Sequence, residues 1–95
     1  MTAMDKQNRL TVTENIRAIV NLDFSKEIRI FLNLADNTIL LSNDIELDFP
    51  CFGIVNFDKK FRFFLPKDVR EYLQLTSENQ LLVYSKKGNL VIQKV

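Results

Sequence analysis

Two stretches of the chain, DKQNRLTVTENIRAIVNL (residues 5–22) and DKKFRFFLPKDVREYLQL (residues 58–75), align without gaps at an offset of 53 residues. Five of the eighteen aligned positions are identical, where about one is expected by chance, and an internal repeat of this kind determines the architecture. It predicts two copies of a half-fold related by an approximate two-fold, the symmetry of a protein that reads a palindrome. The identical pairs are Asp5/Asp58, Lys6/Lys59, Arg9/Arg62, Arg17/Arg70 and Leu22/Leu75.

The composition indicates one ordered domain over residues 1–95. Hydrophobic residues make up 46% of the chain, with 2 Gly and 2 Pro, which is enough for a modest core. The single cysteine, Cys51, excludes an internal disulfide. No apolar run reaches the ~18 residues of a membrane span, and the N-terminus lacks the apolar centre of a signal peptide. We therefore expect no membrane partner and a cytoplasmic location.

The charge is small overall but unevenly distributed. The net charge is +1, while residues 1–47 carry five basic and seven acidic side chains and residues 48–95 carry eight and five. A local basic patch can hold phosphates even in a nearly neutral chain; the alternative is an ordinary solvated surface. The candidate patch comprises Lys59, Lys60, Arg62, Lys67 and Arg70.

Hydrophobic periodicity predicts the same order of elements in each half: a strand, a D-x-x-x-R turn, a strand, a short helix and a hairpin. Thr13 and Pro66 both suit the start of a helix. The fold class is therefore mainly β with short helices. The expected strands of the second half are 52–57 and 62–65, and the expected hairpins pair 27–33 with 38–42 and 80–85 with 89–94.

The boundaries follow from this order. Residues 1–42 form the first half, residues 43–51 the connection and residues 52–95 the second half. Ile45, Leu47 and Phe49 alternate within the connection, so it is expected to continue as an edge strand.

The second half carries a family resemblance. Its turn Asp58-Lys59-Lys60-Phe61-Arg62, its strand ending in Pro66 and its helix residues Val69, Arg70 and Leu73 resemble the bacterial AbrB/MazE/MraZ (SpoVT-AbrB) group of swapped-hairpin DNA-binding domains. The resemblance covers residues 52–95 well and residues 1–42 more faintly, and two halves in one chain are similar to the MraZ type.

The resemblance implies a swapped-hairpin β-barrel formed by the two halves. It also implies a nucleoid-associated transcriptional regulator that reads double-stranded DNA as a homo-oligomer. Carried over residue by residue, it directs Arg62 and Arg70 towards DNA, and by the internal repeat Arg9 and Arg17. Lys59, Lys60 and Lys67 are expected to add phosphate contacts.

The chain departs from the family at two kinds of position. Where the family has Gly before the motif arginine, this chain has Asn8 and Phe61. Phe is costly in the left-handed region, so we expect the second turn to have a different shape. A second helix arginine is replaced by Ala18 and Glu71, which removes positive charge.

Chemistry gives the motif residues separate roles. An arginine fork can engage phosphate or guanine through two donors. Asp5 and Asp58 would be repelled by phosphate, so we expect each to accept hydrogen bonds from turn backbone or from its own arginine and to stabilise the turn. The alternative is that the Asp–Arg pairs stabilise the turns and do nothing else.

Additional apolar residues predict an association surface. Phe61 and Phe64 align with the polar Asn8 and Thr11; an alternative is that basic and aromatic residues here stack single-stranded bases. Leu82 and Tyr84 add apolar surface on one strand. The candidate homo-oligomer interface is Phe61, Phe64, Leu82 and Tyr84.

An enzyme is not expected. The chain has no His, no metal-ligand spacing, no Gly-rich phosphate loop and no nucleophile paired with a base. We therefore expect no cofactor, no metal and no small-molecule substrate. Two alternatives to the regulator remain: a protein-interaction or assembly module, and a MazE-like antitoxin. Against the latter, Val95 follows directly on the last expected strand, leaving no tail to wrap a toxin.

Overall fold

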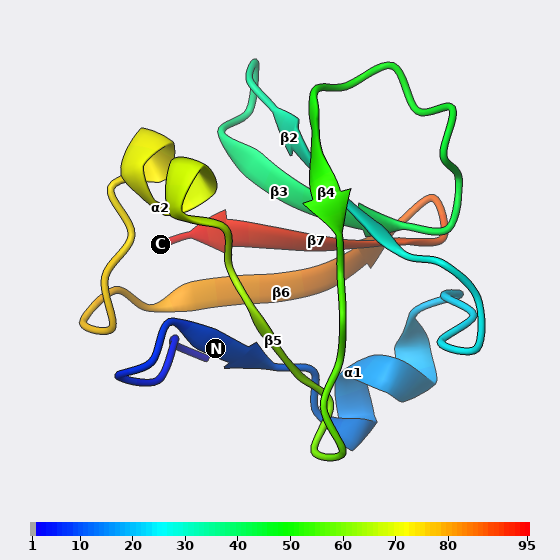
Figure 1. The fold of residues 1–95 in the computed structure, drawn as a ribbon, viewed down its shortest axis with the longest axis horizontal. Coiled ribbons are helices and arrows are strands. Elements are labelled where there is room, and N and C mark those ends of the chain that lie inside the picture. Colours follow the sequence, from blue (N-terminus) through cyan, green and yellow to red (C-terminus); the bar gives the residue numbers. More distant parts are fainter. Residues whose placement is uncertain (1) are drawn as a thin grey trace.

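The computed structural model describes residues 2–95; Met1 lies outside the described residues. Within them are seven strands in two sheets and two short helices (Figure 1). The expected mainly β composition with short helices is confirmed. The elements are β1 (Arg9–Thr11), α1 (Glu14–Ile19), β2 (Arg29–Asn33), β3 (Thr38–Ser42), β4 (Cys51–Ile54), β5 (Arg62–Phe64), α2 (Lys67–Leu73), β6 (Leu81–Lys86) and β7 (Asn89–Lys94).

The larger sheet contains five antiparallel strands in the order β4-β2-β3-β7-β6. It joins both halves of the chain, because β3 pairs with β7 at its centre and β4 pairs with β2. The two hairpins, β2–β3 and β6–β7, lie where the sequence predicts them. Alternate residues along β3 and β7 point into the main core, among them Ile39, Leu41, Leu90 and Ile92, all at most 1% exposed.

The smaller sheet is a two-stranded ribbon of β1 and β5, and its register carries the symmetry of the aligned sequences. Leu10 lies opposite Phe63, its own counterpart at the offset of 53 residues. Beyond the strands, the amide of Val12 donates to the carbonyl of Phe61 (2.9 Å), and the amide of Leu65 donates to the carbonyl of Asn8 (3.0 Å). These two bonds are also related by the offset. The two halves therefore meet around a local pseudo-two-fold at Leu10 and Phe63.

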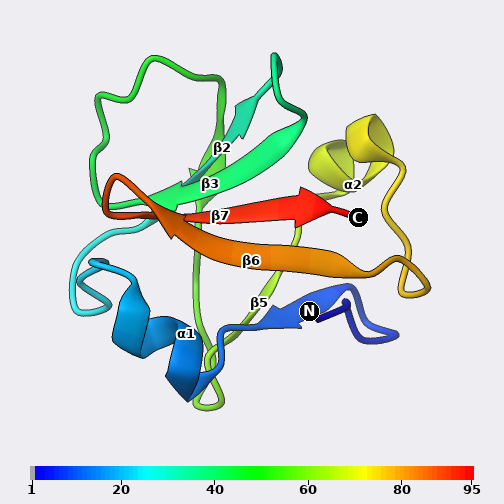
Figure 2. The ribbon, with the colours of Figure 1, turned by 180° about the vertical axis from the view of Figure 1, so that it is seen from behind.

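The segment from β4 to β5 crosses one face of the large sheet. It passes in front of β6 and β7 in Figure 1 and behind them in the reverse view of Figure 2. The β4–β5 segment and β1 lie on one side of the main core, and the large sheet lies on the other. Leu10 and Phe63 therefore pack in the same cluster as Ile39. Helices α1 and α2 lie at opposite ends of the molecule in both views.

Both helices begin as the sequence predicts. The Thr13 side chain caps α1 by accepting from the amide of Ile16 (3.4 Å), and Pro66 precedes the first residue of α2. Helix α2 buries Val69 and Leu73 and ends at Gln74 in the left-handed conformation (φ 54°). Within residues 2–95, neither helix is long and apolar enough to cross a membrane.

The structure corrects two expectations. The described residues form two sheets and no closed barrel, because the ribbon is a separate sheet and the large sheet keeps two outer strands, β4 and β6. The connection does not continue as an edge strand either. The carboxylate of Asp44 accepts from the amide of Glu46 (2.9 Å), which turns the chain, and Leu47 and Phe49 pack against the opposite face of the sheet.

Neighbouring phenylalanines in β5 provide a test of this packing. Phe63 is 1% exposed and Phe64 is 65% exposed. We expect Phe63→Ala to lower the free energy of unfolding by about 3–5 kcal/mol and Phe64→Ala to change it by less than about 0.5 kcal/mol. Urea denaturation of both variants measures this. Equal losses in the two variants would contradict the orientation of β5.

Candidate nucleic-acid interface

The first D-x-x-x-R turn is closed by its aspartate. The Asp5 carboxylate accepts from the amides of Gln7 (2.9 Å) and Arg9 (3.0 Å) through Oδ1, and from Arg9 Nε (2.8 Å) through Oδ2. The backbone adds bonds from the Asp5 amide to the Arg9 carbonyl (2.9 Å) and from the Asn8 amide to the Asp5 carbonyl (3.1 Å). One carboxylate therefore sets both the turn and the position of the guanidinium.

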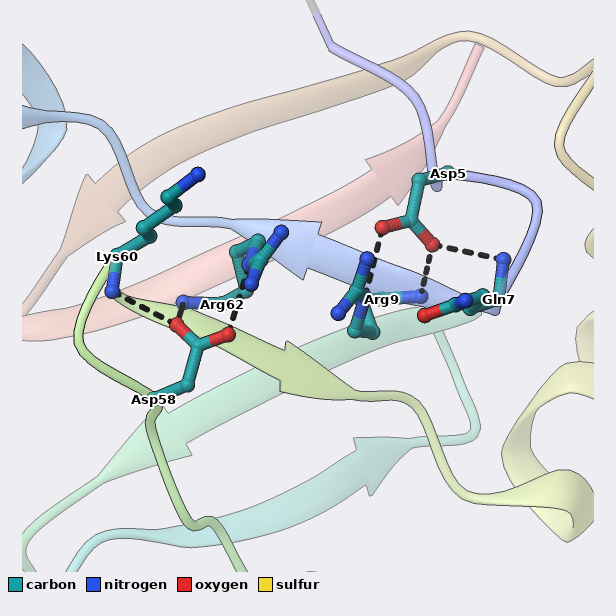
Figure 3. A network of polar contacts seen from close by, with 6 residues as sticks. All are labelled: Asp5, Gln7, Arg9, Asp58, Lys60 and Arg62. Carbon is teal, nitrogen blue, oxygen red and sulfur yellow. Dashed lines mark hydrogen bonds and ion pairs between the residues drawn. The ribbon is translucent and has the colours of Figure 1, made fainter.

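The second turn repeats these contacts atom for atom (Figure 3). Asp58 Oδ1 accepts from the amides of Lys60 (2.8 Å) and Arg62 (3.0 Å), and Oδ2 accepts from Arg62 Nε (2.7 Å). The amide of Asp58 donates to the Arg62 carbonyl, and that of Phe61 to the Asp58 carbonyl, both at 3.0 Å. Asp5 and Asp58 thus make the turn contacts expected of them.

These contacts favour the ionised carboxylates. The backbone amide of Arg9 is the largest influence lowering the pKa of Asp5, and that of Arg62 the largest lowering the pKa of Asp58. The arginine side chains and the second amide in each turn act in the same direction, while partial desolvation opposes them. Both side chains are more than a third exposed, so the turns remain in contact with solvent.

The expectation of a different second turn is wrong. Phe61 has φ 57° and Asn8 has φ 64°, so both turns use the left-handed conformation. The cost for a Phe is offset by contacts of its ring. The Phe61 ring packs edge-on against Phe24 (5.8 Å between centroids) and near Phe57 (6.4 Å), and the Arg17 guanidinium lies 3.8 Å from its centroid.

The helix arginines support the ends of the ribbon. Arg17 Nη1 donates to the Val12 carbonyl (2.7 Å), and Arg70 Nε donates to the Leu65 carbonyl (3.0 Å). Val12 and Leu65 are counterparts at the offset of 53 residues, so these two hydrogen bonds are made to equivalent carbonyls. Each helix arginine holds the strand that precedes its own helix.

The outward face of the ribbon brings two of the predicted arginines together. Leu10 and Phe63 point into the core, so the alternation of a strand places their neighbours on the opposite face. Arg9 lies across from Phe64, and Thr11 across from Arg62. Thr11 and Phe64 are exposed, and the side chains of Arg9 and Arg62 are 22% and 28% exposed. We call Arg9, Thr11, Arg62 and Phe64 the ribbon face.

Each guanidinium group on this face is oriented by a hydrogen bond to an aspartate and keeps N–H donors for a further partner. Arg9 and Arg62 use Nε for their aspartates, and within residues 2–95 no protein partner is recorded for their Nη atoms. The Arg9 guanidinium carbon also lies 6.0 Å from the centroid of the Phe64 ring. Two oriented forks with free terminal nitrogens are suited to anionic or guanine partners.

The predicted lysines are not equivalent. Lys59 and Lys60 are exposed in the second turn, next to the ribbon face, and the Lys60 side chain extends away from the Asp58 carboxylate in Figure 3. Lys67 lies at the start of α2 and pairs with Glu71 (3.7 Å between Nζ and Oε1). Both members of that pair are well exposed, so the attraction is weak.

Sequence reasoning did not place Thr11 or Phe64 on the double-stranded DNA surface; it gave Phe64 as part of a homo-oligomer interface or, alternatively, of a surface that stacks single-stranded bases. The alternation in Arg9-Leu10-Thr11 and in Arg62-Phe63-Phe64 could have identified both residues. Residues i and i+2 of a strand share a face, so Thr11 lies beside Arg9 and Phe64 beside Arg62. Sequence reasoning also missed Phe24, because that residue reaches Phe61 across the fold.

Of the four residues expected at the homo-oligomer interface, two are exposed and two are half-buried. Phe64 and Leu82 are 65% and 43% exposed. Phe61 is half-buried among aromatic rings, and Tyr84 is half-buried against Phe31, Leu40 and Val91.

Within residues 2–95, no group of three or more His, Cys, Asp or Glu side chains is placed to hold a metal ion. Compared with known proteins, the chain matches no family model, no curated protein and no solved structure.

The turn carboxylates predict an acid-sensitive contribution to stability. Because the folded pKa of Asp58 lies below its ordinary value of 3.8, its stabilisation is complete above the unfolded pKa and is lost as pH falls through the folded pKa. We expect Asp58→Asn to lower Tm at about pH 7, and the Tm gap from wild type to narrow below about pH 4. Thermal unfolding monitored by circular dichroism across this range measures the gap.

Asp48→Asn serves as the control, because Asp48 is exposed and lies outside both turns. Its Tm gap should be small at every pH. A gap for Asp58→Asn that stays constant down to pH values well below 4 would contradict the role of the ionised carboxylate.

Proposed function

We propose that this protein binds double-stranded DNA through the ribbon face and regulates transcription. The observation that carries the proposal is the pair of arginine forks, Arg9 and Arg62. Each is oriented by the same Asp contact (2.8 and 2.7 Å) on either side of a local pseudo-two-fold.

The shape of the ribbon supports a duplex partner. A two-stranded antiparallel ribbon fits the major groove of B-DNA, where arginine can bond to guanine through two donors. Duplex DNA has its own local two-folds, so a symmetric pair of arginines matches a palindromic step. Thr11, between the arginines, can contact either a base or a phosphate.

Charge supports a dominant role for the second half. Its turn carries Lys59 and Lys60 beside Arg62, whereas the first turn carries Lys6 and Gln7 beside Arg9. Asp5 and Asp58 offset part of this charge, so affinity depends on lysines that remain free in solvent. Arg17 and Arg70 act mainly through the ribbon ends that they support, as their bonds to backbone carbonyls indicate.

We also propose that the halves exchange elements in the manner of the swapped-hairpin AbrB/MazE/MraZ group. Two pairings support this. Strand β4, which precedes the second turn, pairs with the first-half strand β2, and Thr2, which precedes the first turn, bridges to Leu81 of the second-half strand β6. The proposal does not require a closed barrel.

DNA binding predicts an order among variants. Arg62→Ala should weaken binding to a duplex DNA pool more than Arg9→Ala. If Arg62 reads a base, its loss costs about 1–3 kcal/mol and relaxes specificity. Lys60→Glu should lower affinity evenly across sequences and make the salt dependence shallower. Mobility shift at two salt concentrations measures both effects.

The lysine variant separates charge from folding, because its side chain supports no contact in the turn. Lys87→Glu makes the same charge change in the β6–β7 turn and should bind DNA as wild type does. Equal binding by wild type and an Arg62→Ala/Arg70→Ala variant that keeps its circular dichroism spectrum would exclude this DNA interface. So would the absence of binding by wild type at low salt.

One observation favours a second function, an assembly module with no DNA partner. Phe64 is 65% exposed on the ribbon face, opposite Arg9, and exposed aromatic residues are enriched at protein interfaces. Homo-oligomerisation through Phe64 and Leu82 would then be the principal activity. Light scattering at micromolar concentration tests it: a larger mass that Phe64→Ser returns to the monomer, without DNA binding, favours assembly.

A further inference from the structure

Two strands of the large sheet, one from each half, offer a comparison within one molecule. Strand β2 of the first half and β6 of the second are counterparts at the offset of 53 residues. The outer edge of β2 is covered by β4, whereas β6 pairs with β7 on one side and, on the other, has among residues 2–95 only the bridge from Thr2 to Leu81. No other described residue pairs with this edge of β6, which we call the open edge.

Backbone hydrogen bonds define what is open. On β2, the Ile28 carbonyl accepts from the Val55 amide (2.8 Å), Ile30 pairs with Gly53, and the Leu32 amide donates to the Pro50 carbonyl (3.0 Å). The outer edge of β2 is therefore paired at every second residue, from Ile28 to Leu32.

On β6, the equivalent positions are Leu81, Val83 and Ser85. Leu81 exchanges two bonds with Thr2 (2.9 and 2.6 Å). Because the edge-facing groups of an antiparallel strand alternate, the N–H and C=O groups of Val83 and Ser85 point to the same side. Within residues 2–95, no partner on that side is recorded for them.

Side-chain burial differs in the same way. Ile30 and Phe31 are each 1% exposed, whereas their counterparts Val83 and Tyr84 are half-buried and Leu82 is 43% exposed. A cavity of about 240 Å³ lies beside the open edge, bordered by Thr2, Ile16 and Val83 among others. On the covered side, Phe52 of β4 packs against the main core.

Charged residues beside β4 and β6 indicate what kind of segment could pair with the open edge of β6. Acidic residues (Asp44, Glu46 and Asp48) precede β4, which runs antiparallel to β2. An equivalent strand on β6 would start beside Lys86 and Lys87, which are exposed and have no ion pair recorded within the described residues. Acidic residues before an apolar strand would therefore meet positive charge.

We propose that the open edge of β6 binds an extended peptide segment of a partner protein as an antiparallel strand. The segment has acidic residues followed by apolar ones, in the manner of residues 46–54. Its backbone bonds to Val83 and Ser85 in the way that residues 50–53 bond to Ile30 and Leu32, and an inward apolar side chain enters the cavity beside Val83. The added strand covers an edge of a kind that recruits extended segments. The proposal is independent of DNA binding.

The probe is the chain's own strand, a capped synthetic peptide of residues 46–54 with Cys51→Ser. We expect it to bind the full chain, with slower amide hydrogen exchange at Val83 and Ser85. Ser85→Pro removes the edge-facing N–H at a position where an outer strand tolerates proline and should weaken binding by about tenfold. Ser85→Ala keeps the N–H and should bind as wild type does. Fluorescence polarisation and exchange measured by NMR give the two readouts.

A modified peptide gives a test that does not depend on whether the Ser85→Pro variant folds. Methylating the peptide nitrogen at the Gly53 position, which would face Val83, should abolish binding to unmodified protein, and methylating it at the Ile54 position should not. Absence of peptide binding would overturn the proposal, as would binding that leaves Val83 and Ser85 exchange unchanged. Protection of these amides that rises with protein concentration in the absence of peptide would replace the partner with a second copy of the chain.

Discussion

The structure depends on the antiparallel contact of β1 with β5, where Leu10 meets Phe63. Each three-residue strand is too short to be stable alone. The pair is held because two aspartates close the turns that feed it, two helix arginines hold its far ends, and its inner side chains are fully buried. Because both turns and both helix arginines make these contacts around one point, the outward residues Arg9 and Arg62 are fixed relative to each other.

Rigid support and binding draw on different atoms of the same arginines. Nε of Arg9 and of Arg62 donates to an aspartate, whereas the Nη atoms have no protein partner among residues 2–95. An arginine held in this way loses less side-chain entropy on binding than a free one, so the Asp–Arg pair need not be an alternative to DNA recognition. The helix arginines differ, because Arg17 also stacks on the Phe61 ring.

Much of the fold could be predicted from local patterns. The repeated turn, the Thr13 and Pro66 helix starts and both hairpins depend on residues close in sequence, and they lie where periodicity predicts. The failures were long-range. The left-handed Phe61 looked unfavourable because its compensating contacts come from distant residues, Phe24 and Arg17. The connection looked like a strand because alternation cannot distinguish pairing with an edge from packing of Leu47 and Phe49 on a face.

For the candidate site, the sequence predicts which arginines take part but not how they are arranged. The sequence identified Arg9 and Arg62 but could not show that Thr11 and Phe64 lie between them, since this requires the β1–β5 register. The comparison of β2 with β6 has the same character. Two strands at equivalent positions of the repeat differ in what pairs with them: among residues 2–95, β2 has β4 on its outer edge and β6 has only Thr2. An approximate repeat therefore indicates more where its symmetry breaks than where it holds, because an uncovered counterpart identifies the place where another chain can add the strand that β4 adds to β2.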